Sequence, residues 1–579
     1  MLKKIVFIFI LSSISMSIQA INYSISFPKV KAHYVTVEVM FNAVNKEYVD
    51  FKVPVWTPGS YKIREFSNAI ENVNAAELKI DRVDKNTWRI HTNGQKNVKL
   101  TYDVYCFTIS VRQSYVDEFY GFLHGVSVFG YLEGYENEPI DLIIYPNKTW
   151  ANVEVSLPKT NLSMHSFSCE NYDLLADSPI ALGNFDITSY TSGNVLHKIV
   201  MIGKGNYNLD EIQQDFKKIS DWQVAIMGDH PSPQYIHFIY NVAQGGGGLE
   251  HLNSQTSMMS RWNYTNPNAY RNFLGLIAHE YFHLWNVKRI RPIELGPFDY
   301  NHEVYTDMLW IAEGITSYYD DLTLLSIGKY SQDEYLNIIA SQINRMENSP
   351  GKSMMSLAHS SLLTWVKAYL PNEESSNTNI SYYNKGMITA LLLDLEIRKS
   401  SDKSLDDVMR MLYIDFYKNK NRGFYFDEFI KVSSLIAGKD MTNFFKTLVY
   451  STNPIDYQIF SHFGLELSLI NKDEKSPWCG VTSQLKDGQI LITNIVSGSP
   501  AMEAGLSVND EIISINNWRL TDKMETYISK FDVNEHIELI YARDLKIHKE
   551  PLKLVQDPTL EYILTVDDDK NVFLKQWLK

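Results

Sequence analysis

Apolar and polar residues alternate along several stretches in the first third of the chain. The clearest stretches are 35–41, 98–106 and 153–157. A period of two is typical of half-buried strands. The turn-forming pairs Pro58-Gly59 and Asn93-Gly94 separate such stretches. The pattern therefore predicts an antiparallel, β-sandwich-like domain over residues 21–205.

The pattern changes after residue 205. Residues 206–330 mix strand-like runs with a helix-like stretch at 272–287, and residues 331–464 are mostly helical. This order predicts an α+β domain followed by a helical continuation. One break at 371–379, rich in Asn, Ser and Glu, should form a surface loop. Strand-like runs return over 465–579 and predict a further small domain.

The N-terminus has the pattern of a secretory signal peptide. Lys3 and Lys4 precede an apolar run at 5–11, and small residues lead to Ala20. The run is too short to span a bilayer, which needs about 20 residues, so a membrane anchor is the weaker alternative. We expect residues 1–20 to be removed and the mature protein to be exported, either periplasmic or secreted, without a membrane span.

Composition narrows the function classes. The 579-residue chain has 54 basic and 68 acidic residues, a net charge of −14, which disfavours nucleic acid as a partner. A hydrophobic share of 45% excludes wholesale disorder. Cys106, Cys169 and Cys479 are too few for a disulfide framework, and no C-x-x-C pair suggests a metal cluster. Cys106 has the inward phase of its strand and should be a core residue.

The strongest chemical signal is the sequence His279-Glu280-Tyr281-Phe282-His283. It fits H-E-x-x-H, in which histidines four apart share one helix face and bind one zinc ion. Glu280 can reach the metal-bound water as general base. The competing interpretation is a buried helix whose histidines only form hydrogen bonds.

A third ligand supports the metal interpretation. Glu313 lies among apolar residues in a second helix-like stretch, where an unpaired carboxylate is costly. Together with His279 and His283 it predicts a His₂Glu site for one Zn²⁺ per chain, although cobalt or manganese could also bind in vitro. An exposed helix position for Glu313 is the alternative. Asp320, seven residues later on the same face, is a weak candidate for supporting a histidine ligand.

The stretch from His279 to Pro292, with Glu313-Gly314 downstream, resembles the glycyl aminopeptidase family, peptidase family M61. Residues 55–61 and 124–129 resemble segments of the N-terminal β domain of that family. The 29 residues between His283 and Glu313 also fit this family better than the alanyl aminopeptidases. The resemblance implies a thermolysin-like catalytic domain at 206–330 with its helical part at 331–464. It also implies a zinc metallo-aminopeptidase that removes small N-terminal residues, Gly or Ala.

The resemblance also carries three further site residues. The glycine-rich segment 246–251 is similar to the one that binds peptide backbone and N-terminus in such aminopeptidases, which gives Gly247 and Glu250 substrate-binding roles. The segment 382–386 is similar to a Tyr-x-Lys-Gly element, in which Tyr383 would stabilise the oxyanion; Tyr382 is the neighbouring alternative. The alternatives without a catalytic role are a flexible hairpin tip for residues 246–251 and a core position for Tyr383.

Residues 496–516 resemble the core of bacterial protease PDZ domains, which bind peptide C-termini by strand addition. Cys479 stands where the carboxylate-binding loop usually has a large apolar residue, so a purely structural module is an equal alternative. The sequence as a whole predicts a zinc aminopeptidase acting on peptides with a free N-terminus. A PDZ-guided zinc endopeptidase and a non-catalytic peptide-binding protein are the alternatives.

Overall fold

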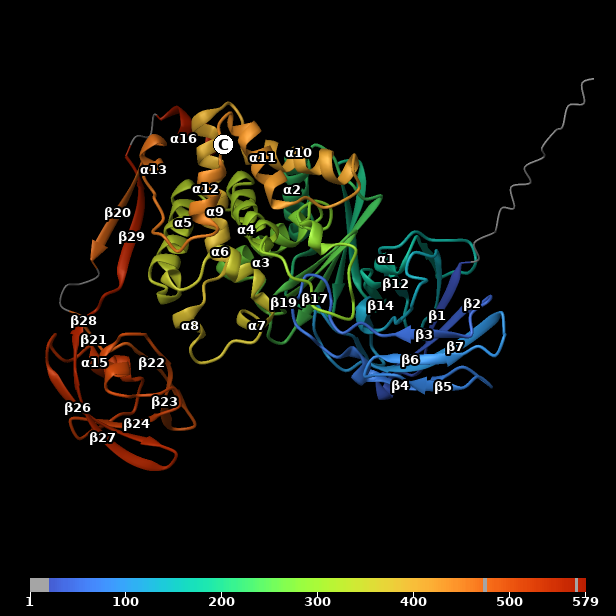
Figure 1. The fold of residues 1–579 in the computed structure, drawn as a ribbon, viewed down its shortest axis with the longest axis horizontal. Coiled ribbons are helices and arrows are strands. Elements are labelled where there is room, and N and C mark those ends of the chain that lie inside the picture. Colours follow the sequence, from blue (N-terminus) through green and yellow to red (C-terminus); the bar gives the residue numbers. More distant parts are fainter. Residues whose placement is uncertain (1–19, 472–475, 568–570, 579) are drawn as a thin grey trace, which may run out of the picture. The chain divides into compact units, whose positions relative to one another are not determined.

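The structure is a computed structural model that describes residues 20–471, 476–567 and 571–578. The predicted signal peptide, apart from Ala20, lies outside these residues. The chain divides into two compact units. The first comprises the described residues up to Val55 together with Arg64–Asn184, and the second comprises Trp56–Ile63 and the chain from Phe185 onward. Figure 1 shows the elements of each unit in the order of the chain.

The largest sheet of the first unit has six strands in the order β13-β11-β1-β2-β7-β4. Their bounds are β1 (Ile21–Lys29), β2 (Tyr34–Asn42), β4 (Ile70–Asn74), β7 (Asn97–Tyr105), β11 (Ile140–Tyr145) and β13 (Ser166–Cys169). Val37 of β2 lies opposite Tyr102 of β7, and both side chains are buried. The strands predicted at 35–41 and 98–106 are thereby confirmed, because their apolar positions share the covered face of one sheet.

Two smaller sheets complete the described part of the first unit. One comprises β10 (Tyr131–Leu132), β3 (Tyr48–Lys52), β6 (Thr87–His91) and β5 (Ile80–Arg82), and the other β12 (Asn152–Val155), β14 (Ile180–Gly183), β9 (Gly121–Leu123) and β8 (Tyr115–Val116). Short helices are η1 (Val30–Ala32), η2 (Phe66–Ala69), η3 (Gly125–Ser127) and α1 (Tyr172–Ala176). The rings of Phe51 and Tyr102, 5.0 Å apart, join two sheets in one core. Cys106 is buried there, as predicted.

The second unit begins with a five-stranded sheet in the order β15-β16-β17-β19-β18. Its strands are β15 (Asp186–Ser192), β16 (Val195–Ile202), β17 (Gln234–Val242), β18 (Gly248–His251) and β19 (Ser254–Ser260). β16, β17 and β19 run parallel, and β18 is an antiparallel edge strand. The sequence alone attached β15 and β16 to the domain at 21–205. In the structure they extend the sheet of the second unit, because β16 pairs with β17 from Leu196 to Ile202.

Helices α2 (Leu209–Met227) and α3 (Pro267–Phe282) pack against this sheet, α4 (Leu309–Ser326) packs against α3, and α9 (Tyr382–Ser400) packs against α4. Asn266 caps α3, since its side chain accepts hydrogen bonds from two amides of the first turn. The predicted helix at 272–287 ends earlier, at Phe282, and His283 follows as its C-cap with helical dihedral angles. A short series of turns replaces the last predicted helical turn.

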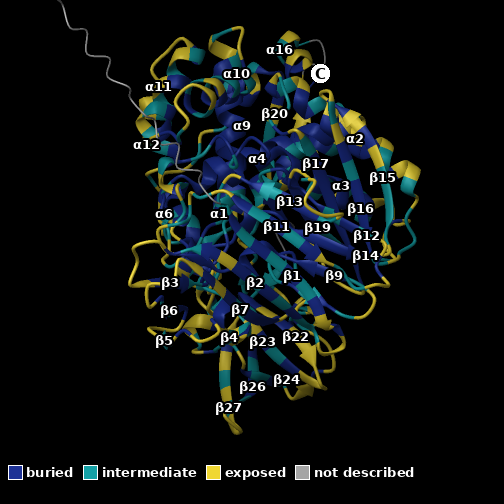
Figure 2. Cartoon of the chain, turned by 90° about the vertical axis from the view of Figure 1, so that its right-hand side faces the viewer, coloured by how far each residue is buried: buried dark blue, intermediate teal, exposed yellow. Residues whose placement is uncertain are grey.

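Helices α4 and α9 cross at a pair of glycines. A β-carbon placed on Gly314 would lie 2.5 Å from the backbone of Gly386, so no larger residue fits without separating the helices. This crossing sets the distance between Glu313, one residue before Gly314, and the N-terminal turns of α9. Both helices are mainly buried, as their dark colour in Figure 2 shows. Among the described residues, no helix is long and apolar enough to cross a membrane.

The remaining helices confirm the predicted helical continuation. They are η4 (Ile293–Leu295), α5 (Gln332–Glu347), η5 (Pro350–Ser353), α6 (Leu357–Leu362), α7 (Thr364–Lys367), α8 (Ser375–Thr378), α10 (Leu405–Leu412), η6 (Tyr413–Lys418), α11 (Phe426–Ala437), α12 (Thr442–Leu448) and α13 (Ile459–His462). The predicted surface loop at 371–379 contains α8, and Asn377 within it is buried. Its side chain donates to the carbonyl of Ile495 and accepts from the amide of Ser497, each at 2.9 Å, which removes it from solvent.

The C-terminal region is a compact β domain with short helices. It contains β20 (Leu465–Asn471), β21 (Pro477–Trp478), β22 (Val481–Lys486), β23 (Gln489–Ile495), α14 (Pro500–Glu503), β24 (Glu511–Ile515), β25 (Trp518–Arg519), α15 (Met524–Ile528), β26 (His536–Arg543), β27 (Lys546–Lys553), β28 (Val555–Gln556), β29 (Leu560–Val566) and α16 (Val572–Trp577). Cys479 belongs to its apolar core. The fold class is therefore the predicted multidomain α+β arrangement.

Candidate metal centre

The last turn of α3 and the first turns of α4 bring His279, His283 and Glu313 together. The Nε2 atoms of His279 and His283 each lie 3.3 Å from Oε2 of Glu313. Glu313 is buried, which answers the alternative of an exposed helix position. The three residues offer two imidazole nitrogens and one carboxylate oxygen that all lie within 4.8 Å of one another. This donor set is typical of a catalytic zinc site.

Each histidine is oriented by a second partner. The Nδ1–H of His279 donates to Asp320 at 2.8 Å, and the Nδ1–H of His283 donates to the carbonyl of Asn286 at 2.6 Å. These bonds direct both Nε2 atoms toward Glu313, as in metal sites whose ligand rings are held from behind. Asp320 was only a weak candidate from sequence, and Asn286 was missed because its contribution is a backbone carbonyl.

The charges at the centre stabilise one another. Burial opposes protonation of His279, but its hydrogen bonds to Asp320 and Glu313 outweigh burial and raise its pKa. Burial likewise opposes ionisation of Glu313, but His283 and His279 outweigh it and hold the pKa of Glu313 low. A carboxylate that stays ionised in a buried site is suited to bind a cation.

Glu280 faces the same centre from α3. It is 5% exposed, and its Oε2 is buried without a hydrogen-bond partner in the described residues. Burial raises its pKa to about 7, against the opposing effect of His279 and His283. A carboxyl group with a pKa near neutrality can both take and return a proton under physiological conditions.

The edge strand β18 lies against Glu280. A β-carbon placed on Gly248 would lie 2.1 Å from Oε1 of Glu280, so a larger residue here would displace the Glu280 side chain from its present position. The sequence singled out Gly247, but a β-carbon there would meet nothing within 4 Å. The close approach belongs to Gly248, and only the tertiary structure shows which glycine of the run makes it.

Glu250, also on β18, points into the centre. It is 4% exposed, and an oxygen of its carboxylate and one ligand atom each of Glu280 and His283 all lie within 4.8 Å of one another. Within the described residues no basic side chain forms an ion pair with it. A buried carboxylate of this kind is stabilised by a positively charged partner.

Tyr383 approaches from the first turn of α9. Its ring lies 6.2 Å from that of His279, at an interplanar angle of 26°. Burial, followed by the charge of Glu313, raises its pKa, so the hydroxyl stays protonated and can donate a hydrogen bond. The alternative, Tyr382, is 2% exposed and packs behind Tyr383 with ring centroids 4.7 Å apart.

The opposite face of α3 rests on a buried network of tyrosines and histidines. Tyr281 shares a 2.8 Å hydrogen bond with Nε2 of His197, and Tyr190 shares a 2.7 Å bond with Nε2 of His237. Burial lowers the pKa of His197 to about 4 and that of His230 to about 3. These histidines are therefore neutral in the folded protein, and they fix the helix that carries the H-E-x-x-H residues.

This network predicts a pH-dependent effect of His197→Gln on stability. The folded pKa of His197 lies below its unfolded value, so the unfolded chain binds more protons between pH 6.5 and 4, and the contribution of His197 is lost as pH falls. We expect wild type to exceed the variant in unfolding free energy by about 1 kcal/mol at pH 7.5. That difference should shift by about 2 to 3 kcal/mol in favour of the variant at pH 4.5.

Urea denaturation at both pH values measures this difference, with His359→Gln at an exposed position as the matched control. A wild type that keeps its whole advantage over His197→Gln at pH 4.5 contradicts the prediction.

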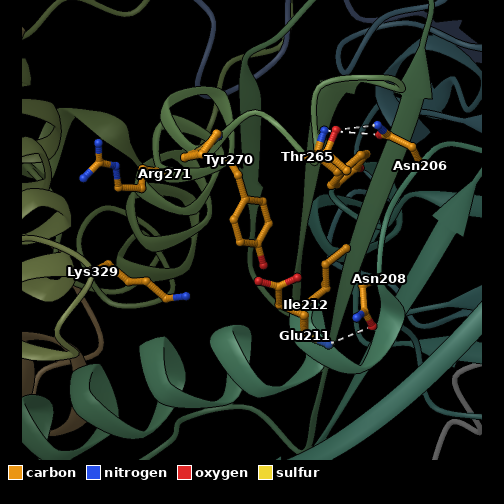
Figure 3. Close-up of a pocket in the computed structure, with 10 residues that line it drawn as sticks. Asn206, Asn208, Glu211, Ile212, Thr265, Tyr270, Arg271 and Lys329 are labelled. Atoms are coloured by element: carbon orange, nitrogen blue, oxygen red, sulfur yellow. Dashed lines mark hydrogen bonds between the residues drawn. The ribbon is translucent and has the colours of Figure 1, made fainter.

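A cavity separate from this centre lies at the N-terminal part of α3. It has a volume of about 540 Å³ and is lined by Tyr270 and Arg271, nine and eight residues before His279, with residues of α2 and Lys329 (Figure 3). Lys329 pairs with Asp215 at 2.5 Å, and Arg271 pairs with Glu334 at 2.6 Å. Its basic groups are thus already neutralised, and it contains none of the predicted site residues.

In the C-terminal domain, helix α15 packs beside the edge strand β22. The amide of Ser483 on the edge strand β22 donates to Oε1 of Glu525 at 2.7 Å. A peptide added to this edge would need that amide. Strand addition at Ser483 therefore requires Glu525 to move away.

Comparison with known proteins identifies the chain. The sequence profile of the Peptidase M61 N-terminal domain matches residues 22–184, that of M61 glycyl aminopeptidase matches residues 272–389, and that of a PDZ domain matches residues 477–554. The chain belongs to the M61 peptidase family. The M61 chain is thus a metallopeptidase of an aminopeptidase family, with a C-terminal PDZ domain.

The chain is also similar to solved structures of other proteins. An aminopeptidase N family protein from Idiomarina loihiensis is 28% identical, with a TM-score of 0.90 over 96% of this chain and 100% of that one. An M1 zinc metallopeptidase from Deinococcus radiodurans is 10% identical (TM-score 0.47, 76% of this chain and 95% of that one). Yeast LTA4 hydrolase is 13% identical (TM-score 0.44, 76% and 69%). None of the curated proteins compared with the chain matches it.

Proposed function

We propose that this M61 peptidase is a zinc aminopeptidase that removes small N-terminal residues, Gly or Ala, from peptides. The observation that carries the exopeptidase activity is the buried carboxylate of Glu250, which has no basic partner among the described residues and faces Glu280 and His283. A free α-ammonium is the group of a peptide that matches this carboxylate, and an internal peptide nitrogen has no such charge.

The residues present fit zinc. Two neutral-capable imidazoles and one ionised carboxylate would hold one ion per chain, and the buried, unpartnered Oε2 of Glu280 supports a water molecule beside it. His279 and His283 already donate their Nδ1 protons elsewhere, which leaves the Nε2 lone pairs for the metal. When bound, zinc supplies a Lewis acid for the scissile carbonyl and makes water more acidic.

The chain's own residues perform the remaining chemistry. Glu250 binds the ammonium and sets the position of the first peptide bond. Glu280, with a pKa of about 7, accepts a proton from the attacking water and passes it to the leaving nitrogen. Tyr383 is protonated and donates a hydrogen bond to the carbonyl oxygen as negative charge develops there. The edge strand β18 provides backbone groups for the substrate strand.

The N-terminal pattern supports export of the enzyme to the periplasm or medium as part of this proposal. Binding of peptide C-termini by the PDZ domain would require Glu525 to release the amide of Ser483, to which it is hydrogen-bonded.

A peptide panel tests the function directly. Release of the first residue is measured from Gly-, Ala-, Leu- and Arg-peptides and from N-acetylated copies, with and without chelator and added Zn²⁺. We expect cleavage only of free-amine Gly and Ala peptides, its loss with chelator, and its recovery with one Zn²⁺ per chain. Cleavage of acetylated peptides at internal bonds would establish the endopeptidase alternative. Zinc binding without any cleavage would favour a binding protein.

Glu250→Gln should weaken recognition of the free N-terminus. The substitution keeps the size of the side chain but removes its charge. A charge-assisted hydrogen bond contributes about 1.5–3 kcal/mol, so we expect kcat/KM for Gly-peptides to fall about 10- to 100-fold. Zinc content, measured by atomic absorption, should not change. An unaltered preference for free over acetylated peptides would disprove the anchoring role of Glu250.

A further inference from the structure

Residues Trp56–Ile63 form a turn that belongs to a different compact unit from the residues before and after it. The residues on either side of it belong to the first unit, whereas the segment itself belongs to the second. The amide of Ser60 donates to the carbonyl of Thr57 at 3.1 Å, and Gly59 has φ +80°. Pro58 followed by a glycine with positive φ is the sequence of a type II turn. The segment therefore delivers Gly59 at the tip of a tight turn.

Aromatic packing fixes this turn in the second unit. Trp56 is fully buried, and its indole N–H donates to the carbonyl of Asp299 at 2.7 Å. Its ring lies 5.2 Å from that of Trp365, in an edge-on arrangement. A buried tryptophan with its N–H satisfied is a strong anchor. The tip of the turn is therefore held in place.

The tip lies directly against the proposed ammonium anchor. A β-carbon placed on Gly59 would lie 2.5 Å from Oε1 and 2.7 Å from Oε2 of Glu250. The same carboxylate faces Glu280 and His283. An ammonium bound by Glu250 would thus lie between the turn and the metal residues. A residue preceding that nitrogen would have to occupy the place of the turn backbone.

Tyr61 follows Gly59 by two residues and packs against aromatic side chains of the second unit. Its ring lies 5.6 Å from Trp365 and 6.2 Å from Tyr369. Tyr369, in turn, lines a cavity of about 420 Å³ together with Tyr382 and Tyr383. Burial raises the pKa of Tyr61, and the charges of Glu313 and Glu250 add to this effect, which agrees with a ring near both groups. Tyr61 is 4% exposed, so its ring lies within this packed group of aromatic side chains.

We propose that Gly59 and Tyr61 set the substrate specificity. The Gly59 turn leaves room for only one substrate residue before the cleaved bond, and Tyr61 limits the side chain of that residue to a small one. This inference rests on the proposed aminopeptidase function and deepens it. It assigns a role to the Trp-Thr-Pro-Gly-Ser-Tyr motif, whose residues lie far from the metal ligands in sequence.

Tyr61→Ala tests the limit on side-chain size. We expect kcat/KM for Leu-peptides relative to Gly-peptides to rise at least tenfold, because a hydrophobic pocket that gains room typically changes discrimination by one to two orders of magnitude. Tyr61→Phe keeps the ring and should leave the ratio within twofold of wild type. A ratio unchanged in Tyr61→Ala would overturn the role of Tyr61.

Gly59→Ala tests the contact with the anchor. Affinity for Gly-Phe-amide is measured by calorimetry on zinc-loaded protein that also carries Glu280→Gln, so that hydrolysis does not interfere. We expect Kd to rise at least tenfold. Gly94→Ala is the matched control, since Gly94 has φ +78° and a β-carbon there meets nothing within 4 Å. It carries the same backbone strain, and its Kd should change less than twofold.

The outcomes separate this inference from the function beneath it. If wild type cleaves only free-amine peptides but the Gly59→Ala and Gly94→Ala proteins have equal Kd, the Gly59 turn does not limit the substrate. The proposed aminopeptidase function then still holds. A wild type that cleaves acetylated peptides at internal bonds overturns both, because a site that accepts preceding residues has no stop at Gly59.

Discussion

Glu280→Gln should reduce kcat for a Gly-peptide by about 10³- to 10⁴-fold without loss of zinc. The amide cannot accept the proton of the attacking water, and general-base catalysis of this kind typically contributes up to about 10⁴-fold. His279, His283 and Glu313 are untouched by the change, and the isosteric side chain still fits beside Gly248.

Initial rates and metal content of the purified variant measure both parts of this prediction. Glu303→Gln, at an exposed position, is the control and should match wild type. Full turnover by Glu280→Gln with zinc bound would show that another group is the base. Loss of zinc together with activity would show that Glu280 contributes to the metal site itself.

Tyr383→Phe should reduce kcat/KM by about 10²- to 10³-fold, the effect typical of removing one donor to a developing oxyanion. The loss should appear in kcat, since the ground-state carbonyl gains less from the hydroxyl than the charged intermediate does. The ring contact with His279 remains in the variant, so zinc affinity should not change.

Tyr382→Phe is the matched comparison, because Tyr382 is 2% exposed and its ring packs 4.7 Å from that of Tyr383. We expect a loss below tenfold, through a slightly misplaced Tyr383. If Tyr382→Phe is the more damaging change, the assignment of the two tyrosines must be reversed.

Several features could be predicted from the sequence because they depend on local order. Alternating apolar residues define β2 and β7 whatever they pair with, and H-E-x-x-H places two histidines on one face of α3 by helix geometry alone. Glu313 was predicted because a lone acid in an apolar helix needs a partner. The helical continuation and the PDZ domain likewise follow from continuous segments of sequence.

Other features depend on segments that are distant in sequence. The assignment of β15 and β16 needs their partner β17, and pairing partners are not encoded in the pattern of a single strand. The burial of Asn377 depends on two backbone groups more than a hundred residues away. Gly248, and not Gly247, lies against Glu280 because β18 takes one particular register on β19.

The sequence by itself determined the donor residues and the class of chemistry, because ligand spacing within a helix and the cost of a buried charge are local properties. Only the tertiary structure decided how the site is bounded. The crossing of α4 and α9 at Gly314 and Gly386 and the turn that places Gly59 on Glu250 are contacts between remote segments. Their geometry follows from packing of the whole unit, and no local pattern specifies it.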